Sequence, residues 1–295
     1  MSNSDSLAKV VPIPLDTIDD PSPIVPQKKS WLVPTLYRIQ KYSAYSFISF
    51  LGIHVTSVII VPILPIDQTI KDEIFSMGKA IYQSVPLYEP IFIIGSVSAH
   101  LLSGISLRIY KKFFTKKNNS TTSKTKSVDS PVRRLNDHDD EIGFGGLANL
   151  FGLGYRKSFT LKFGLTPLQF SGYLLVPFLL YHFYKFRYLP LINDDDSSLI
   201  NLEYISYVLN LKHPAWNVLA LSSLVWIMSY HATNGMLKLQ SKYSPYWKKI
   251  GLGIVNGLGV LGMFAVYLFK SNSEIIDING FLGKSFKKYI DSYWL

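Results

Sequence analysis

The sequence predicts an all-α membrane protein with five transmembrane helices. Of its 295 residues, 48% are apolar and only 17% are charged, whereas a soluble domain is usually about a quarter charged. The apolar residues are also grouped into stretches of about 20, the length of helix that crosses a bilayer core. Helices of soluble proteins carry an apolar stripe rather than an apolar circumference, so buried helices of a soluble core are the weaker interpretation.

The predicted spans have no charged side chains in their central turns. Lys185 and Arg187, near the end of the third span, are the exception, and their long stems allow the charges to reach the headgroups. The five spans are residues 43–64, 90–109, 168–189, 216–237 and 250–269.

An internal repeat relates the first two spans to the next two. A shift of 128 positions brings the first span onto the third, and a further slip of three residues brings the second onto the fourth. Each unit reads as a span, an amphipathic stretch and a second span, so we expect two parallel two-helix repeats. The matched residues are Ser43 with Ser171, His54 with His182, Pro62 with Pro190, His100 with His231, and Gly104 with Gly235.

The amphipathic stretch of each unit is expected to lie flat at the far membrane interface. Its apolar residues are Ile70, Ile74, Phe75 and Ile81 in the first unit, and Ile200, Tyr204, Ile205 and Val208 in the second.

The basic residues predict the orientation. The N-terminal segment, the loop after the second span and the loop after the fourth, counted with Arg108 at the adjoining end of the second span, together hold 21 of the 30 Lys and Arg residues. Cytosolic loops carry such an excess, so we expect a cytosolic N-terminus and a C-terminus across the membrane. The predicted parts are a disordered cytosolic arm (1–42), the first repeat (43–112), a cytosolic basic loop (113–160), the second repeat (161–240), and the fifth helix with a C-terminal tail (241–295).

Other classes of function fit the composition poorly. The net charge of +10 follows from the one-sided basic loops, and no nucleic-acid-binding fold accompanies it. The chain has no Cys, so thiolate chemistry is excluded, and we expect no catalytic residues and no enzymatic activity. The fifth span is rich in Gly. Its Gly253-x-x-x-Gly257 pair permits close helix packing, either inside the bundle or in self-association with a second copy.

Four histidines lie one to a span: His54, His100, His182 and His231. Ionisable side chains at membrane depth are costly and indicate a functional site. Depth along the helices and repeat symmetry both pair His54 with His182 and His100 with His231. Paired imidazoles on facing helices can ligate a haem iron, so the four are candidate axial ligands of haem b. Gly104 and Gly235 would leave room for the porphyrin.

Two alternatives remain open for the histidines. Each ring N–H could instead be donated to a carbonyl or hydroxyl of a neighbouring helix, with Ser98, Ser103, Ser229 and Thr233 as available partners. A proton or ion path is the second alternative, but no carboxylate accompanies the histidines inside the predicted spans.

The N-terminal arm contains a short apolar motif in a polar surrounding. Two prolines two positions apart favour an extended backbone, which lowers the entropy lost when a groove binds the peptide. Pro21-Ser22-Pro23 in the same arm lacks apolar flanks. The candidate partner-binding residues are Leu7, Val10, Pro12, Ile13, Pro14 and Leu15.

Two resemblances follow from these residues. The segment from Ser30 to Tyr37, Ser46 and Ser49 before His54, and His100-x-x-x-Gly104 resemble the cytochrome b anchor subunits of succinate dehydrogenase and fumarate reductase. That family typically has Arg after the first-helix His, and Val55 stands here instead. Over almost the whole chain, the five spans, duplicated His helices and Pro-x-Pro arm resemble the fungal MDM-ten-complementing protein family of the mitochondrial outer membrane.

The second resemblance implies an adaptor function. The family is understood to recruit a large bridge-like lipid-transfer protein of the vacuolar-protein-sorting class to mitochondria, through a short Pro-x-Pro peptide. It implies an outer-membrane location with the C-terminus in the intermembrane space, and a role in lipid supply at organelle contacts. A b-type cytochrome that moves electrons and a lipid scramblase are the alternative functions.

Overall fold

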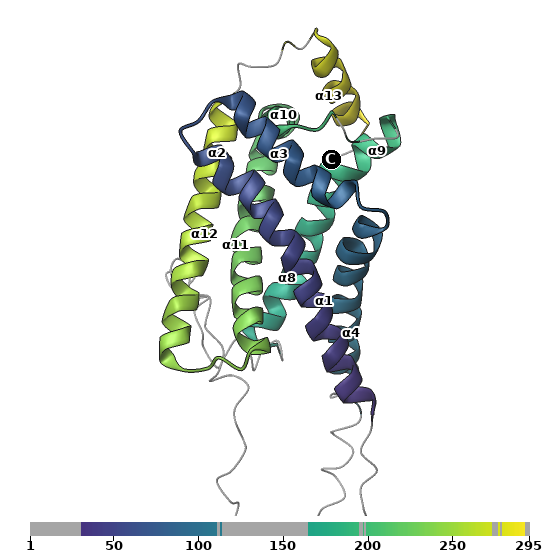
Figure 1. The fold of residues 1–295 in the computed structure, drawn as a ribbon, viewed down its shortest axis with the longest axis vertical. Coiled ribbons are helices and arrows are strands. Elements are labelled where there is room, and N and C mark those ends of the chain that lie inside the picture. The colour runs from purple at the N-terminus through teal and green to yellow at the C-terminus, as the bar shows by residue number, and fades with distance from the viewer. Residues whose placement is uncertain are drawn as a thin grey trace, which may run out of the picture.

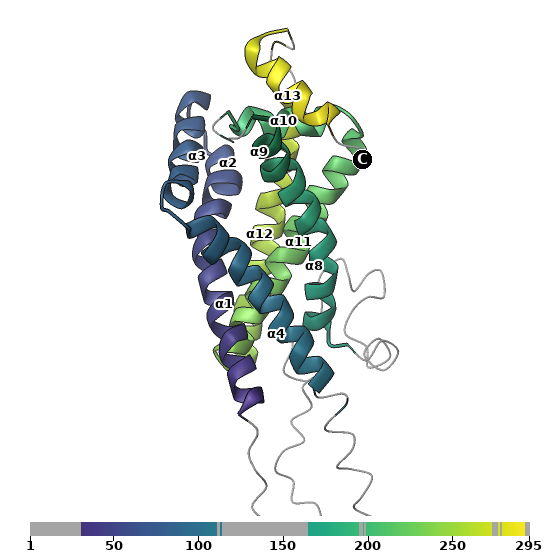
Figure 2. The same cartoon turned by 90° about the vertical axis from the view of Figure 1, so that its right-hand side faces the viewer.

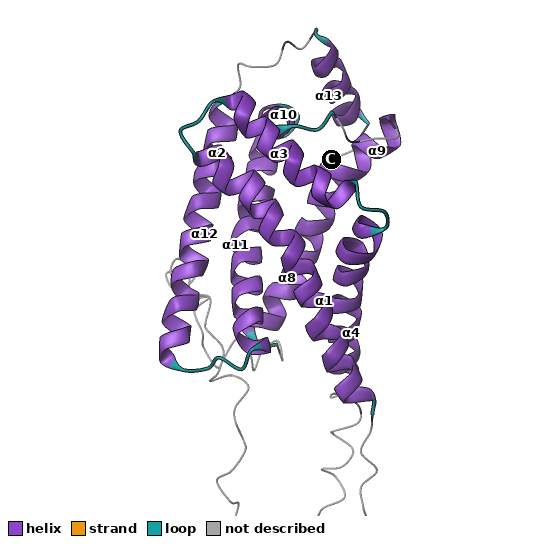
Figure 3. Ribbon diagram, viewed as in Figure 1, coloured by secondary structure: helices purple, strands orange, loops and turns teal. Residues whose placement is uncertain are grey.

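The computed structural model describes residues 31–110, 113, 165–194, 197, 199–272, 277 and 279–292. All regular secondary structure in these residues is helical (Figure 3). Three continuous helices are long and apolar enough to cross a membrane: Leu32–Ile63, Tyr88–Tyr110 and Pro245–Ser271. Two further long helices, α8 (Pro167–Phe183) and α11 (Pro214–Leu239), lie in the same bundle (Figure 1).

The first long helix begins earlier than expected. It consists of α1 (Leu32–Val55), a π-helical turn η1 (Thr56–Ile60) and α2 (Val61–Ile63). The segment 1–42 was predicted to be a disordered arm. Its last residues, 32–42, are helical instead. Pro34 does not prevent this, because it lies in the first turn, where backbone N–H groups have no helical partner.

Local sequence signals set the other helix starts. Thr166 and Gln169 form a reciprocal capping box at the start of α8, in which each side chain accepts a hydrogen bond from the other residue's backbone N–H. Pro167, Pro214 and Pro245 occupy the first positions of α8, α11 and α12 (Pro245–Ser271), where proline is favoured. The second long helix combines the π-helical η2 (Tyr88–Gly95) with α4 (Ser96–Tyr110).

The long helices pack as two pairs, and a fifth long helix packs against one of these pairs. The helix α1 lies along α4, α8 lies along α11, and α12 packs against the opposite side of α11 (Figures 1 and 2). The α11–α12 contact depends on Gly259 and Gly262, because a Cβ at either would clash with Trp226 or Val225. Gly253 and Gly257 differ, since a Cβ at either would meet nothing within 4 Å. Their pair therefore faces away from α11, and self-association through it stays a prediction.

The two ends of the bundle are unlike. One end holds the start of α1, the end of α4, the start of α8 and the turn between α11 and α12 (Figure 1). The three segments that carry most of the basic residues all adjoin this end. The other end holds the shorter helices α3 (Gln68–Gln83), α9 (Leu189–Asp194), α10 (Leu202–Asn210) and α13 (Phe281–Asp291).

The helix α3 ties the two halves of the chain together at this second end. Asp67 caps it by accepting a hydrogen bond from the backbone N–H of Thr69 at 2.8 Å, which holds the pKa of the Asp67 carboxyl below its usual value. The buried Lys79 donates from Nζ to the carbonyl oxygens of Ser197 and Ile200, at 2.9 and 2.8 Å. A buried ammonium is tolerated here because it is hydrogen-bonded.

The C-terminal helix α13 corrects two expectations. Residues 241–295 were predicted to end in a tail, and the apolar side of the second amphipathic stretch was predicted to lie in the membrane interface. Instead α13 covers α10. The ring of Tyr204 in α10 lies 4.9 Å from the ring of Phe286 and 5.9 Å from that of Tyr289. All three side chains are almost completely buried, so protein rather than lipid covers this side of α10.

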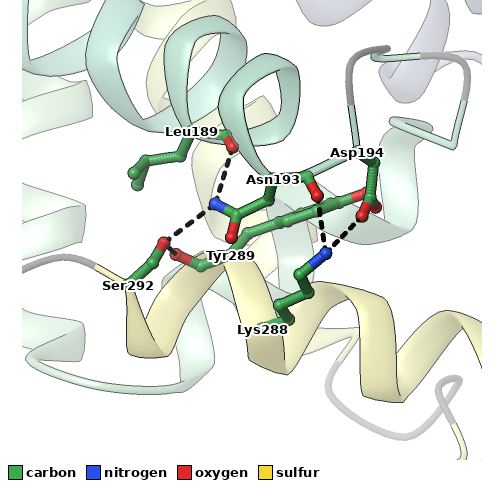
Figure 4. Close-up of polar contacts among 6 residues, drawn as sticks. All are labelled: Leu189, Asn193, Asp194, Lys288, Tyr289 and Ser292. Atoms are coloured by element: carbon green, nitrogen blue, oxygen red, sulfur yellow. Dashed lines mark hydrogen bonds and ion pairs between the residues drawn. The ribbon is translucent and has the colours of Figure 1, made fainter.

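Polar contacts also hold α13 against α9 (Figure 4). Lys288 donates from Nζ to the carbonyl oxygen of Asn193 and to Oδ1 of Asp194, both at 2.6 Å. The hydroxyl of Tyr289 donates to the other carboxylate oxygen of Asp194, and Asn193 donates from Nδ2 to Ser292 Oγ at 3.1 Å. These contacts lie partly exposed to solvent, so we expect the buried rings to contribute most of the stability of this contact.

We therefore expect Phe286→Ala to destabilise the protein by about 3–5 kcal/mol, as for truncation of a buried Phe. Phe281→Ala is the matched control, because Phe281 begins the same helix but is 73% exposed. Thermal unfolding of both variants in detergent measures the effect. Equal melting temperatures for the two variants would contradict the buried role of Phe286.

Candidate functional site: two histidine pairs inside the helix bundle

The structure brings the four predicted histidines together as two pairs. His54, near the end of α1, lies with its ring centroid 5.8 Å from that of His182, near the end of α8. His100 in α4 lies 6.1 Å from His231 in α11, again between ring centroids. The rings of each pair are steeply inclined, at 73° and 87°. Each pair thus joins one helix of the α1–α4 pair to one helix of the α8–α11 pair.

The second pair is held by hydrogen bonds from neighbouring helices. His100 Nδ1 lies 3.1 Å from the backbone carbonyl oxygen of Gln40 in α1, and His231 Nδ1 lies 3.1 Å from Ser171 Oγ in α8. A carbonyl oxygen only accepts, so His100 carries its proton on Nδ1. Ser171 donates its own hydroxyl proton to the carbonyl oxygen of Leu168 at 2.8 Å. It therefore accepts from His231, whose proton is also on Nδ1.

The surroundings of these two histidines correspond under the shift of 128 positions. In the first half, Ser43 Oγ donates to the Gln40 carbonyl oxygen at 3.2 Å, the same oxygen that accepts from His100. In the second half, Ser171 donates to Leu168. Gln40 corresponds to Leu168, and Ser43 to Ser171. Both halves thus use one serine and one carbonyl, three residues apart, beside the histidine of the following helix.

The pair of His54 and His182 has a different environment. The Nδ1 atoms of both rings are buried and have no hydrogen-bond partner among the described residues. Aromatic rings contact them instead: Phe50 stacks on His54 at 5.3 Å, and Phe186 lies 5.0 Å from His182. A buried nitrogen without a partner costs about 1–3 kcal/mol, so this pair costs stability that the other pair does not.

A π-helical turn follows each histidine of that pair. It spans Thr56–Ile60 after His54 and Tyr184–Tyr188 after His182, again 128 positions apart. Such turns are rare in proteins overall, and those that occur are often found at functional sites. Neither was anticipated from the sequence, because the extra residue of a π turn leaves no composition signal.

Glycines shape the space around His100 and His231. A Cβ at Gly172 would lie 2.8 Å from Cε1 of His231, so only glycine lets this ring rest against α8. Gly104 and Gly235 follow His100 and His231 by one helical turn. A Cβ at Gly235 would meet nothing within 4 Å, and one at Gly104 would meet only the flexible end of Gln40 at 3.2 Å.

Several expectations about these partners need correction. Of the four hydroxyls suggested for the histidines (Ser98, Ser103, Ser229 and Thr233), Ser103 bonds the carbonyl oxygen of His100 in its own helix. The imidazole bonds go to Gln40 and Ser171, on the preceding helix of each unit. The signal for Ser171 was present in the repeat alignment with Ser43. Nothing in the sequence marks the Gln40 carbonyl, because every residue has one.

The remaining predicted site lies outside the described residues. The arm residues Leu7, Val10, Pro12, Ile13, Pro14 and Leu15 all precede residue 31. The basic loop 113–160 is described only at residue 113.

The hydrogen bond between Ser171 and His231 makes a testable difference between the two halves. Ser171→Ala removes this acceptor, while His231 keeps its hydrogen bond to the backbone of Leu168, so the variant should lose about 0.5–1.5 kcal/mol, the contribution of one hydrogen bond. Ser43→Ala is the matched control, since His100 keeps its bond to the Gln40 carbonyl. Melting temperatures in detergent should fall clearly for the first variant and little for the second. The opposite order would contradict the assigned bonding.

Comparison with known proteins identifies the family of the chain. The model of the transmembrane domain of MDM10-complementing protein 1 matches residues 49–161 and 177–266, which include all four histidines. The chain is 24% identical over 253 residues to the mitochondrial adapter protein MCP1 of Saccharomyces cerevisiae, an alignment that covers 83% of this chain and 78% of that protein. No solved structure matches. Because the family model matches more than half of the chain, the protein belongs to the family of MDM10-complementing protein 1.

Proposed function

We propose that this protein is an adaptor of the mitochondrial outer membrane that recruits a bridge-like lipid-transfer protein of the vacuolar-protein-sorting class through its N-terminal arm. The observation that carries the proposal is the match, over most of the chain, to a relative named as a mitochondrial adapter protein. The partner, the contact site between organelles and the role in lipid supply rest on the resemblance of the Pro-x-Pro arm described above.

The architecture that we propose has five transmembrane helices, built as two parallel repeats plus α12. The repeated order of elements supports it, since a long helix with a π turn, a short helix and a second long helix occur twice. The equivalent histidine environments support it further. Lys185 is buried and donates to Asn217 Oδ1 at 2.5 Å, so its charge does not prevent the helix that contains it from crossing a bilayer.

The proposed orientation places the arm in the cytosol. The arm joins α1 at the end of the bundle where α4 also ends and α8 begins. The basic residues adjoin the same end, and basic loops face the cytosol. A partner in the cytosol would then reach the arm, whereas α13 would lie in the intermembrane space.

Limited proteolysis of intact mitochondria tests this orientation. Added protease should remove an epitope placed at the N-terminus and cut within 113–160, while an epitope after α13 should survive until the outer membrane is opened. Protection of the N-terminal epitope would contradict both the orientation and the adaptor function, which requires a cytosolic arm.

The arm itself is tested by substitution. Pro12→Ala with Pro14→Ala should abolish recruitment of the lipid-transfer protein. Without the prolines the backbone loses its preference for the extended conformation, and Val10 and Ile13 are no longer positioned to bind the groove. Each buried apolar side chain contributes about 1.5–3 kcal/mol, offset by the ordering of the arm. Membrane insertion should not change, since the arm precedes α1.

The matched control is Pro21→Ala with Pro23→Ala, a second pair of prolines in the same arm without apolar flanks. Co-localisation of a fluorescently labelled lipid-transfer protein with mitochondria measures recruitment for both double variants. Undiminished recruitment by the Pro12 and Pro14 variant, at equal protein level, would show that binding lies elsewhere.

A further inference from the structure

We propose that His100 and His231 bind a haem, with one imidazole on each side of the iron. This site is separate from the N-terminal arm and goes beyond the adaptor function. It rests on the spacing of the two rings, the position of their protons, the number of donors and the glycines beside them.

The spacing of the rings fits two ligands of one metal ion. A metal ion bound by two opposed imidazoles lies about 2 Å from each nitrogen, which separates the ring centroids by about 6 Å. The centroids of His100 and His231 are 6.1 Å apart. The two rings come from helices of different packed pairs, so a group between them would join the two halves of the bundle.

The position of the protons leaves the correct nitrogen free. Because Nδ1 of His100 donates to the Gln40 carbonyl oxygen and Nδ1 of His231 donates to Ser171, Nε2 of each ring has its lone pair. Metal-binding histidines usually donate their other ring N–H to a carbonyl or a similar acceptor, which fixes the ring and makes it a better ligand. Both histidines have this support before any ligand is bound.

The number of donors indicates the class of ligand. No group of three or more His, Cys, Asp or Glu that could hold a metal ion occurs in the described part of the chain. A zinc ion takes three or four protein ligands, so two imidazoles alone do not make a zinc site. A tetrapyrrole supplies the other four donors itself. Haem iron with two histidine ligands has both axial positions filled, which suits one-electron transfer.

The glycines one turn beyond each histidine provide room for such a group. Gly235 has open space where a Cβ would stand, and Gly104 has only the end of the Gln40 side chain near it. Gly104 and Gly235 occupy the same position in the two repeats, four residues after His100 and His231, so space is left on corresponding faces of α4 and α11.

The other pair provides the internal control. His54 and His182 have nearly the same ring separation, 5.8 Å, but no hydrogen-bond partner for Nδ1 among the described residues. Within the described residues, no hydrogen bond to Nδ1 fixes which nitrogen of these rings is protonated. We therefore assign the haem to His100 and His231 only.

The test uses the full chain, expressed with adequate haem supply and purified in mild detergent. The absorbance spectrum should show a Soret band and, after reduction, the sharp α-band of six-coordinate haem. Pyridine haemochrome analysis should give one haem per chain. Absence of haem from the well-folded, monodisperse protein, both as purified and after addition of hemin, would overturn the proposal.

Substitutions then locate the site. His100→Ala or His231→Ala should abolish the six-coordinate spectrum, whereas His54→Ala and His182→Ala should keep it. Retention in both of the first variants, or loss confined to the second two, would overturn the assignment. Circular dichroism and size-exclusion chromatography show whether each variant folds.

A second variant keeps the test decisive if His231→Ala is poorly folded. In His231→Gly, added imidazole should restore the six-coordinate spectrum by filling the space of the deleted ring. Ser171→Ala should retain the spectrum but lower the affinity for haem by about 10–100-fold, as for loss of an outer partner of a metal ligand. Failure of imidazole to restore the spectrum of a folded, haem-containing His231→Gly would contradict ligation by His231.

Recruitment of the lipid-transfer protein should be unaffected in these variants, which separates the haem site from the adaptor function.

Discussion

A polar group inside a bundle that faces lipid has no water to bond, so it must find its partner within the chain. This constraint explains most of the polar contacts of the molecule. Serines inside the long helices return their hydroxyl protons to carbonyl oxygens three or four residues earlier, as Ser57 and Ser96 do. His100 and His231 instead form hydrogen bonds with a neighbouring helix. Nδ1 of His54 and Nδ1 of His182 are therefore exceptions, since both are buried and have no partner in the part of the chain that the structure describes.

The same constraint operates on the cations at the end of the bundle that holds α3 and α10. Lys79 bonds the carbonyl oxygens of the segment before α10, and Arg187 forms an ion pair with Glu89. Asn217 Nδ2 lies within hydrogen-bond distance of three carbonyl oxygens in and just after α10, including that of Val208 at 2.6 Å. The contacts of Lys79 and Arg187 connect elements that are distant in sequence. They hold α3 and η2 against the second half of the chain at this end.

Sequence alone could predict the helical class and the pairing of the histidines, because both follow from patterns in residue type. Apolar runs mark the long helices, and the repeat brings His54 to His182 and His100 to His231. Sequence could not predict the acceptor of His100, since a backbone carbonyl has no residue signature. It missed α13, although Phe286, Tyr289 and Ile290 have helical spacing, because α13 is too short and too polar to resemble a span. It also left open which glycines of α12 face α11, which only packing against Trp226 and Val225 decides.

The π turns after His54 and His182 have a consequence for how the two halves differ. Each turn inserts one residue into the helix, which rotates the side chains that follow by about 100°. The second residue of each turn is buried. That residue is Ser57 in one half and Lys185 in the other, exposed by 3% and 1%. Ser57 satisfies itself within its own helix, whereas Lys185 requires Asn217 from α11. The same kind of turn thus carries a buried neutral side chain after His54 and a buried lysine after His182, so only the second turn needs a polar partner from another helix.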